Sequence, residues 1–247
     1  MLDEVKTNNV HLIKGDCLEV MKNIKDNSID MILCDLPYGT TANKWDTIIP
    51  LDKLWEQYNR IIKDNGVIAL FSQMPFSAKL VSSNYKNFRY EWIWEKEQGT
   101  GFLNAKKMPL KAHENILIFY KKLPLYNPQW EWGKPYKRLC ISKFSSNYGK
   151  QVYGVSSISD GRRYPKDIIK IKRDKANINF HPTQKPVELL SYLIKTYTSD
   201  GDPILDNCMG SGSTGVAVLE VGGDRKFIGI ELDDKYFDIA CNRIRGD

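Results

Sequence analysis

Short apolar runs that alternate with amphipathic segments constrain the fold of this chain more than any other feature of its sequence. Residues 29–34 (IDMILC) and 67–71 (VIALF) are almost entirely apolar, which is typical of strands buried on both faces of a sheet. Residues 51–63 (LDKLWEQYNRIIK), between these runs, place apolar side chains at helical spacing. This alternation favours an α/β fold, in which helices cover both faces of a mostly parallel sheet.

The same alternation extends over most of the chain. Six helical segments are predicted, and the seven predicted strands lie at 10–14, 29–34, 67–71, 90–96, 114–121, 203–206 and 226–231. With 247 residues and 42% apolar content, the chain is long enough for one domain with a sizeable insertion. We therefore predict a doubly wound, mostly parallel, seven-stranded α/β sheet.

Residues 121–180 interrupt this alternation, so we interpret them as an insertion between two halves of one domain, 1–120 and 181–247. From residue 121 to residue 178, fourteen Lys and Arg stand against four Asp and Glu, although the whole chain carries only +6. A basic block with interspersed aromatic residues is typical of a nucleic-acid surface, and a solvated loop-rich face is an equal alternative. The candidate DNA contacts in the insertion are Arg138, Arg162, Arg163 and Lys166.

The cysteines and the N-terminus indicate a cytoplasmic protein. The five cysteines are odd in number and contain no CxxC pair, which argues against a disulfide framework and against a zinc site. The first residues (MLDEVKTNN) lack the basic start and apolar stretch of a secretory signal. No run of eighteen apolar residues is present, which excludes a membrane helix.

Acidic residues recur where the predicted strands end. Asp16 follows the first strand, Asp35 follows the second, and Asp206 and Glu231 end the last two. Ligands of open parallel sheets bind outside the carboxyl ends of the strands, so these four side chains are predicted to line one crevice. Any single one of them is more often a helix cap or a turn residue, and Asp16 fits that alternative.

The turn after Asp206 (NCMGSGSTG) is typical of a cofactor-binding loop. Gly210, Gly212 and Gly215 match G-x-G-x-x-G between a strand and a helix, and Glu231 can accept hydrogen bonds from ribose hydroxyls. The pattern fits both a dinucleotide and S-adenosylmethionine. Only thirty-two residues follow Gly215, too few for the second half of a dinucleotide fold. The N-terminal part of the chain can supply that half, so an NAD-dependent enzyme stays an alternative.

The clearest chemical signal is the sequence Asp35-Leu36-Pro37-Tyr38 at the end of a buried strand. The nitrogen of an aromatic amino group is a poor nucleophile, because its lone pair is delocalised into the ring. A carboxylate and the carbonyl of the next residue can accept its two N–H bonds and draw the nitrogen towards a tetrahedral form, while proline fixes the loop. Tyr38 can stack on a base that has left the duplex. The alternative is a plain strand-to-loop turn.

These motifs resemble the amino-methylating DNA methyltransferases of restriction–modification systems and phages, in the subgroup whose catalytic motif precedes the cofactor motif. Residues 35–39 (DLPYG) resemble the catalytic D-P-P-Y loop, with Leu36 where proline is usual. Residues 206–214 (DNCMGSGST) resemble the cofactor loop D-x-F-x-G-S-G-T, with Cys208-Met209 in place of a more usual aromatic residue. The flanking segments that share the resemblance are residues 181–186 (HPTQKP) and 229–244.

The resemblance implies a role for each matching residue. Asp35 and the Leu36 carbonyl would accept the target amino group, and Tyr38 would stack on the flipped base beside Pro37. Glu231 would bind the ribose hydroxyls of S-adenosylmethionine. The other residues that would bind or enclose this cofactor are Asp16 at its adenine, Gly210, Ser211 and Gly212 at its methionine part, Lys185 closing the site, and Cys17, Asp206 and Asn207 around them.

We therefore expect a Rossmann-like methyltransferase that methylates the N6 amino group of adenine in a specific double-stranded DNA sequence, by base flipping and without a metal ion. Asp35 favours adenine, and cytosine N4 is the alternative. Enzymes that methylate RNA or protein carry similar loops, but the motif order and the basic insertion favour DNA. An inactive DNA-binding protein is a further alternative, against which the intact motifs argue. The resemblance also allows a homodimer and a cognate restriction endonuclease as partners.

Overall fold

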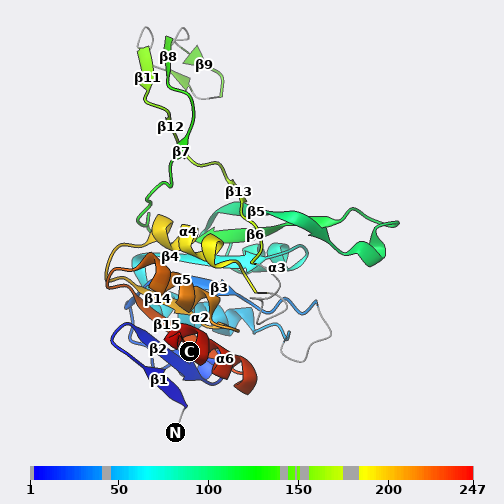
Figure 1. Ribbon diagram of the computed structural model, residues 1–247, viewed down its shortest axis with the longest axis vertical. Helices are drawn as coiled ribbons and strands as arrows, with labels where there is room; N and C mark the ends of the chain where they lie inside the picture. The colour runs from blue at the N-terminus through cyan, green and yellow to red at the C-terminus, as the bar shows by residue number, and fades with distance from the viewer. Residues whose placement is uncertain are drawn as a thin grey trace. The chain divides into compact units, whose positions relative to one another are not determined.

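The computed structural model describes residues 3–40, 46–139, 144–147, 149–150, 156–174 and 184–246 (Figure 1). The chain divides into two compact units, of which the first combines Met1–Asn127 with Asp167–Asp247 and the second is Pro128–Lys166. The second unit therefore lies within the predicted insertion. Among the described residues, no helix is long and apolar enough to cross a membrane.

The first unit contains a central sheet with the strand order β1-β2-β15-β14-β3-β4-β6-β5-β13. Five neighbouring pairs in this sheet are parallel and three are antiparallel. The strands are β1 (Glu4–Lys6), β2 (Val10–Lys14), β3 (Ile29–Asp35), β4 (Ile62–Ser72), β5 (Phe88–Thr100), β6 (Lys111–Phe119), β13 (Ile168–Lys170), β14 (Pro203–Asp206) and β15 (Lys226–Glu231). The helices are α1 (Cys17–Met21), α2 (Leu51–Ile61), α3 (Phe76–Ser83), α4 (Val187–Tyr197), α5 (Ser213–Val221) and α6 (Asp234–Arg245).

The prediction of a doubly wound, mostly parallel α/β sheet is confirmed, and all seven predicted strands lie in it. The predicted number of strands is two too low, because β1 and β13 join the sheet at its edges. β1 pairs antiparallel with β2, and β13 pairs parallel with β5. Each of these edge strands is three residues long, which is too short for an alternating pattern to be recognised in sequence.

Two apolar cores lie on opposite faces of the sheet. Along β3, Met31 and Leu33 belong to one core, and Ile32 and Cys34 belong to the other. Helices α4, α5 and α6 contribute to the first core, whereas α1, α2 and α3 contribute to the second. This burial on both faces is the physical reason for the almost unbroken apolar run at 29–34.

The strand order reverses between β14 and β3. The chain leaves β3 towards β4 on one side, and it leaves β14 towards β15 on the other side. Ligands of doubly wound sheets bind at such a reversal, outside the carboxyl ends of the strands. The four predicted carboxylates therefore follow one another along this edge, in the order Asp16 after β2, Glu231 in β15, Asp206 in β14 and Asp35 in β3.

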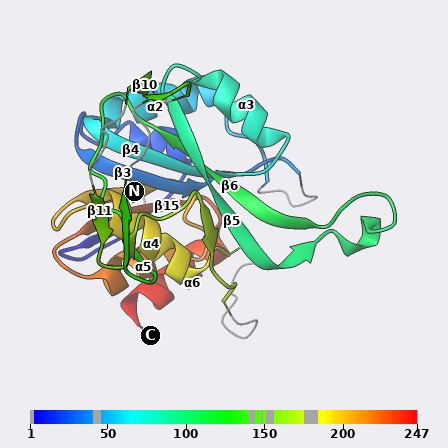
Figure 2. The ribbon, with the colours of Figure 1, turned by 90° about the horizontal axis from the view of Figure 1, so that it is seen from above.

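Strands β5 and β6 form a long antiparallel hairpin, which reaches beyond the rest of the sheet in Figure 2. A short 3-10 helix, Phe102–Asn104, lies at its end. Phe102 and Leu103 are exposed there, and Lys106 and Lys107 follow on the exposed return segment. The end of the hairpin is therefore both apolar and basic.

In the described part of the second unit, three short antiparallel pairs are present. These join β12 (Arg162–Arg163) to β7 (Glu131–Trp132), β11 (Ser156–Ser159) to β8 (Tyr136–Leu139), and β10 (Gly149–Lys150) to β9 (Phe144–Ser145). Aromatic and cationic side chains pack on each other in this unit. The rings of Trp130 and Tyr164 lie 4.5 Å apart, and the Arg162 guanidinium lies 5.5 Å from the Trp130 ring.

Gly215 provides a test of how tightly helix α5 packs on the sheet. A glycine-to-alanine change inside a helix normally stabilises a protein by about 0.5–1 kcal/mol. At Gly215 an added Cβ would meet Ile244 Cδ1 and lie 2.7 Å from Phe227 Cε1. We therefore expect Gly215→Ala to lower the free energy of unfolding by about 1–3 kcal/mol, measured by urea denaturation.

Leu219→Ala is the control, because Leu219 lies on the exposed side of the same helix. This change should alter the free energy of unfolding by less than about 0.5 kcal/mol. A Gly215→Ala variant as stable as the unmodified protein would show that α5 can move away from Phe227 without cost.

Candidate active site

A cavity of about 970 Å³ lies at the carboxyl edge of the sheet, entirely within the first unit. The loops after β2, β3, β14 and β15 line it, together with parts of β5 and β6 and the residues just before α4. All four strand-end carboxylates line this cavity. Neighbouring strands are about 4.8 Å apart, so the row from Asp16 to Asp35 spans about 14 Å. An elongated ligand can therefore lie along the row.

Asp35 lies at the end of the row and has both carboxylate oxygens engaged. The Lys185 Nζ lies 2.5 Å from Asp35 Oδ2, and the Tyr38 hydroxyl donates a 2.7 Å hydrogen bond to Asp35 Oδ1. Burial raises the pKa of Asp35, and the charge of Lys185 limits that rise. The structure thus pairs this half-buried carboxylate with a cation just before α4, 150 residues further along the chain.

The loop after Asp35 is held in place on both sides. The Leu36 side chain is buried in the core to which α1, α2 and α3 contribute, which leaves its backbone at the cavity. The two oxygens of Asp46 accept 2.8 Å hydrogen bonds from the backbone N–H groups of Gly39 and Thr40. The Tyr38 ring stacks on Phe76, with ring centres 5.2 Å apart. Pro37 lines the cavity between these anchors.

A buried chain of alternating charges continues from Asp35. Lys185 also lies 3.2 Å from Oε2 of Glu114, on β6, and Glu114 is paired with Lys96 on β5. The two negative neighbours raise the pKa of Lys185 although burial alone would lower it. Likewise, the two ammonium groups lower the pKa of Glu114 against the effect of burial. Burial lowers the pKa of Lys96, against the attraction of Glu114.

Glu231 holds the glycine-rich turn. Its Oε2 accepts a 2.8 Å hydrogen bond from the Gly210 N–H, and its Oε1 accepts from the N–H groups of Leu232 and Asp233. Gly210 has a positive φ of 51°, so the turn needs glycine there. Glu231 thus fixes the turn without help from a ligand, and it lines the cavity as well.

Asp206 and Asn207 are directed mainly towards the protein. Asp206 accepts hydrogen bonds from the Thr214 hydroxyl at 2.6 Å and the Cys208 N–H at 3.1 Å, and burial raises its pKa to about 7. Asn207 accepts a 2.5 Å hydrogen bond from the buried Tyr58 hydroxyl of α2. Both residues line the cavity, but their side-chain contacts are those of residues that shape a turn.

Ser211 and Gly212 complete the turn, and only Ser211 lines the cavity. Arg243, on α6, donates to the Ser211 carbonyl at 2.6 Å and to its Oγ at 3.0 Å. Gly212 has a φ of 77° and faces α6, where an added Cβ would lie 2.9 Å from the Ala240 Cβ. Position 212 requires glycine because α6 approaches the turn closely there. Gly212 is the one predicted pocket residue that the cavity lining lacks.

Asp16 caps helix α1 at the other end of the row. Its Oδ1 accepts hydrogen bonds from the N–H groups of Leu18 at 2.8 Å and Glu19 at 3.3 Å. This is the capping role that was the alternative for Asp16, and the residue also lines the cavity. Next to it, Cys17 and Cys34 share hydrogen bonds with Cys208, and burial raises the pKa of Cys34 to about 12. Cysteines that are scattered in sequence therefore meet at the cavity.

The lining favours a cationic ligand. Among the described residues that line it, eight side chains are carboxylates and three are cations, namely Lys96, Arg173 and Lys185. S-adenosylmethionine carries a sulfonium and an ammonium group against one carboxylate, whereas the pyrophosphate of a dinucleotide is anionic. Like charges without a partner are costly in a cavity shielded from water. The residues present therefore fit S-adenosylmethionine better than a dinucleotide.

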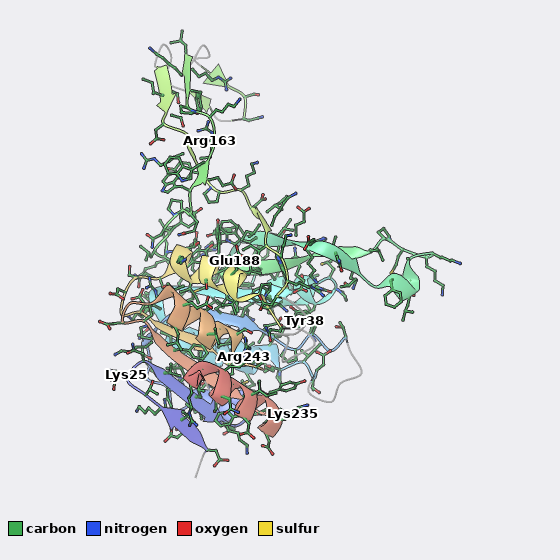
Figure 3. All side chains as sticks on the ribbon, viewed as in Figure 1. Lys25, Tyr38, Arg163, Glu188, Lys235 and Arg243 are labelled. Carbon is green, nitrogen blue, oxygen red and sulfur yellow. The ribbon has the colours of Figure 1, made fainter. Side chains whose placement is uncertain are left out.

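The four predicted DNA contacts lie in the second unit. Arg138 and Lys166 are exposed, and Arg162 is exposed while paired with Asp160. Arg163, which is labelled in Figure 3, is half-buried. It donates to Ser159 Oγ at 2.5 Å and to the Lys134 carbonyl at 2.6 Å. In the HPTQKP segment, residues 181–183 lie outside the described residues, and Gln184 to Pro186 are described.

Sequence reasoning did not single out Lys96, Glu114 or Asp46 as site residues. A signal for the first two was present, because Lys96 ends one predicted strand and Glu114 begins the next. In an antiparallel hairpin these two positions come close together, and Trp94 is the register partner of Glu114. Asp46 had no comparable signal, since its hydrogen bonds depend on how the loop folds back.

Several relatives match nearly the whole chain. The Type II methyltransferase M.HinfI of Haemophilus influenzae is 28% identical over 274 residues, covering 95% of this chain and 68% of the relative. The Type II methyltransferase M2.MboI of Moraxella bovis is 26% identical over 261 residues, covering 95% of this chain and 87% of the relative.

Solved structures share the fold at lower identity. A complex of M1.HpyAVI with SAM has a TM-score of 0.64 at 24% identity, with 95% of this chain and 98% of that chain covered. The cytosine-N4-specific PvuII DNA methyltransferase has a TM-score of 0.70 at 16% identity, with 96% and 87% covered. At these identities the structures support the fold of the first unit and do not distinguish the target base.

The family model for N6 and N4 methyltransferases, described as DNA methylase, matches residues 29–242. This range includes Asp35, Lys185, the glycine-rich turn and Glu231, and it spans most of the chain. The sheet reversal, the row of carboxylates and the acidic cavity agree with that match. The chain therefore belongs to the DNA methylase family of S-adenosylmethionine-dependent amino-methyltransferases, whose targets are adenine N6 and cytosine N4.

Proposed function

We propose that the protein methylates the N6 amino group of adenine in a specific double-stranded DNA sequence, with the target base flipped out of the duplex. The observation that carries this proposal is the position of Asp35, at the end of a row of carboxylates and beside the Leu36 backbone and the Tyr38 ring. When bound, S-adenosylmethionine supplies an electrophilic methyl group. The residues of the chain then have to orient an amino nitrogen and raise its nucleophilicity.

Asp35 and the Leu36 carbonyl are the proposed acceptors for the two N–H bonds of the target. Fixed acceptors stabilise the positive charge that develops on the nitrogen, and in a cavity shielded from water this effect is large. The buried Leu36 side chain and the hydrogen bonds to Asp46 support such a fixed geometry. A leucine at this position keeps the backbone carbonyl, so the departure from proline preserves the acceptor.

Tyr38 has to change partners when a base enters. Its hydroxyl now donates to Asp35 Oδ1, the atom best placed to accept from a target amino group. We propose that the base displaces this hydroxyl and stacks on the ring, which Phe76 supports from its other side. The Tyr38 hydroxyl thus keeps the carboxylate satisfied while the site is empty.

Cytosine N4 is the second candidate target, because its amino group has the same two N–H donors. The solved PvuII enzyme, whose fold this chain shares, is cytosine-N4-specific by its own description. Aspartate at position 35 supports adenine, through the resemblance of the catalytic loop. Expression in a methylation-free host, followed by mapping of the modified positions, distinguishes N6-methyladenine from N4-methylcytosine and reads the recognition sequence.

For the cofactor we propose that Glu231 accepts the ribose hydroxyls, Asp16 meets the adenine, and Gly210 and Ser211 lie against the methionine part. The three N–H groups that Glu231 already accepts fix its carboxylate before a ligand arrives. Such preorganisation lowers the entropic cost of binding. Lys185 is better assigned to Asp35 than to the cofactor, because its Nζ contacts two carboxylates.

For DNA we propose the exposed cations of the second unit as phosphate contacts. Arg138 and Lys166 have exposed side chains, whereas Arg163 is engaged within the unit by Ser159 and Lys134. The basic end of the β5–β6 hairpin is the second candidate surface, with Lys106 and Lys107. A homodimer and a restriction endonuclease partner stay proposals that follow from the kind of relatives found.

Asp35→Asn should lower turnover by a factor of about 100 to 1,000, because the amide loses the charge that accepts the target amino group. Binding of S-adenosylmethionine, measured by calorimetry, should persist. Asp30→Asn is the matched control, since Asp30 lies on the same strand and pairs with Lys63 away from the cavity. Near-normal turnover in Asp35→Asn would rule out the assigned mechanism.

Glu231→Ala should weaken S-adenosylmethionine binding by roughly tenfold to a hundredfold, the equivalent of a charge-assisted hydrogen bond of about 1.5–3 kcal/mol. The variant should also unfold more readily, because the Gly210 N–H loses its acceptor. Glu220→Ala, on the exposed side of α5, is the control for charge removal. Tight binding of NAD with no response to S-adenosylmethionine would restore the dehydrogenase alternative.

Replacing Arg138 and Lys166 by alanine should weaken DNA binding and reduce its dependence on salt, by a slope of about 0.9 for each phosphate that is no longer neutralised. Lys25→Ala with Lys235→Ala removes the same charge from exposed positions of the first unit and is the control. Cofactor affinity should stay constant. An unchanged slope in the first pair would direct attention to Lys106 and Lys107 of the hairpin.

A further inference from the structure

Three buried charges, those of Lys96, Glu114 and Lys185, link the β5–β6 hairpin to the half-buried Asp35. Lys96 and Glu114 form an ion pair whose side chains are 2% and 8% exposed, and the Lys185 side chain is 8% exposed. Lys185 lies between two carboxylates, 2.5 Å from Asp35 Oδ2 and 3.2 Å from Glu114 Oε2. Positive and negative groups therefore alternate from the hairpin to the proposed acceptor of the target amino group.

Stability alone does not account for this network. Taking charges out of water costs several kcal/mol per ion, and replacing a buried ion pair by apolar side chains is often neutral or stabilising. The surrounding residues Trp94, Phe71 and Leu190 show that apolar side chains fit this part of the molecule. Such a cluster at a cavity is typical of groups whose protonation is matched to a reaction.

The Lys185 ammonium lies closer to Asp35 than to Glu114, and the inference is based on this difference. Its ammonium lies close to Asp35, while among the described residues the buried Oε2 of Glu114 has no hydrogen-bond partner of good geometry. Glu114 is thus a second acceptor with unused capacity, beside an ammonium group that is held by the first. A small shift of the Lys185 side chain towards Glu114 exchanges one partner for the other.

We propose that Glu114 and Lys96 are positioning residues, which divide the Lys185 ammonium between two carboxylates and so set how strongly Asp35 accepts the target amino group. Glu114 attracts the Lys185 ammonium and so weakens the contact between Lys185 and Asp35. Lys96 competes with Lys185 for Glu114 and so limits this attraction. The inference rests on the proposed function, because Asp35 is assigned as the acceptor there. Neither residue has to touch the base or the cofactor.

The network predicts a pH profile with known signs. The groups that face Asp35 are Lys185, Tyr38, Glu114, Cys34 and Asp206, and Arg173 acts on the network through Lys96. Glu114 raises the pKa of both Asp35 and Lys185. Removing its charge should therefore lower both pKa values, and removing the charge of Lys96 should raise them.

The test is the single-turnover methylation rate of the full chain as a function of pH, with saturating DNA and S-adenosylmethionine. Glu114→Gln should lower the rate by roughly tenfold to a hundredfold, comparable to the effect of misplacing a catalytic group by about 1 Å. The acid limb of its pH profile, which reports the ionisation of Asp35, should move to lower pH. Lys96→Met should move this acid limb to higher pH. Replacing Glu114 by Asp instead of Gln should restore most of the rate.

Two further variants separate this role from a structural one. Glu95→Gln removes a carboxylate from the same strand as Lys96, at an exposed pair with Lys170, and should leave rate and profile unchanged. The double variant Lys96→Met with Glu114→Gln removes both members of the buried ion pair. It should fold even if Glu114→Gln alone does not, because no unpaired charge is left at this pair. Its methylation rate should stay as low as that of Glu114→Gln.

The outcomes distinguish this inference from the proposed function. If the unmodified protein methylates DNA but the pH profile of Glu114→Gln is not shifted, the proposed role of Glu114 is wrong. The same conclusion would follow from a rate loss in Glu114→Gln that Glu114→Asp does not restore. An unmodified protein that leaves DNA unmethylated would instead refute the proposed function.

Discussion

The site depends on one geometric constraint, which is that β2, β15, β14 and β3 are adjacent, parallel and end at the same edge. Hydrogen bonding fixes their spacing, so the side chains that end them stand in a row whose length the sheet sets. Asp35 ends the strand on one side of the reversal and Asp206 the strand on the other. The spacing between the sites proposed for the cofactor and the target base is thereby set by the backbone of the sheet.

The sequence was sufficient for those parts of the site that local patterns determine. The apolar run before Asp35 and the glycines after Asp206 identify strand ends, and strand ends predict the crevice. The sequence was insufficient for those parts of the site where distant segments of the chain meet. Lys185 gives no local sign that its ammonium lies against Asp35, and Gly212 serves the packing of α6 where sequence suggested the cofactor. The edge strands β1 and β13 were too short to carry a pattern.

Stability and chemistry place opposite demands on this cavity. The glycine-rich turn is held by internal hydrogen bonds, with Glu231, Asp206 and Arg243 each satisfying backbone or hydroxyl groups. The centre around Asp35 instead concentrates charges that burial disfavours. The side of the row proposed for the cofactor therefore has its hydrogen bonds formed without a ligand. On the side proposed for the target, the Tyr38 hydroxyl bonds Asp35 and is the partner that a base would replace.

The position of β15 has a consequence for how the molecule is made. This strand lies between β2 and β14, although it follows both in the chain. During synthesis, β2 is among the first strands to emerge from the ribosome, and it has to wait for residues 226–231 before its parallel neighbour exists. Glu231 arrives with that strand, so the turn at Gly210 gains its acceptor at the same moment. A nascent or truncated chain without β15 thus lacks the carboxylate that accepts from the Gly210 N–H in the turn proposed for the cofactor.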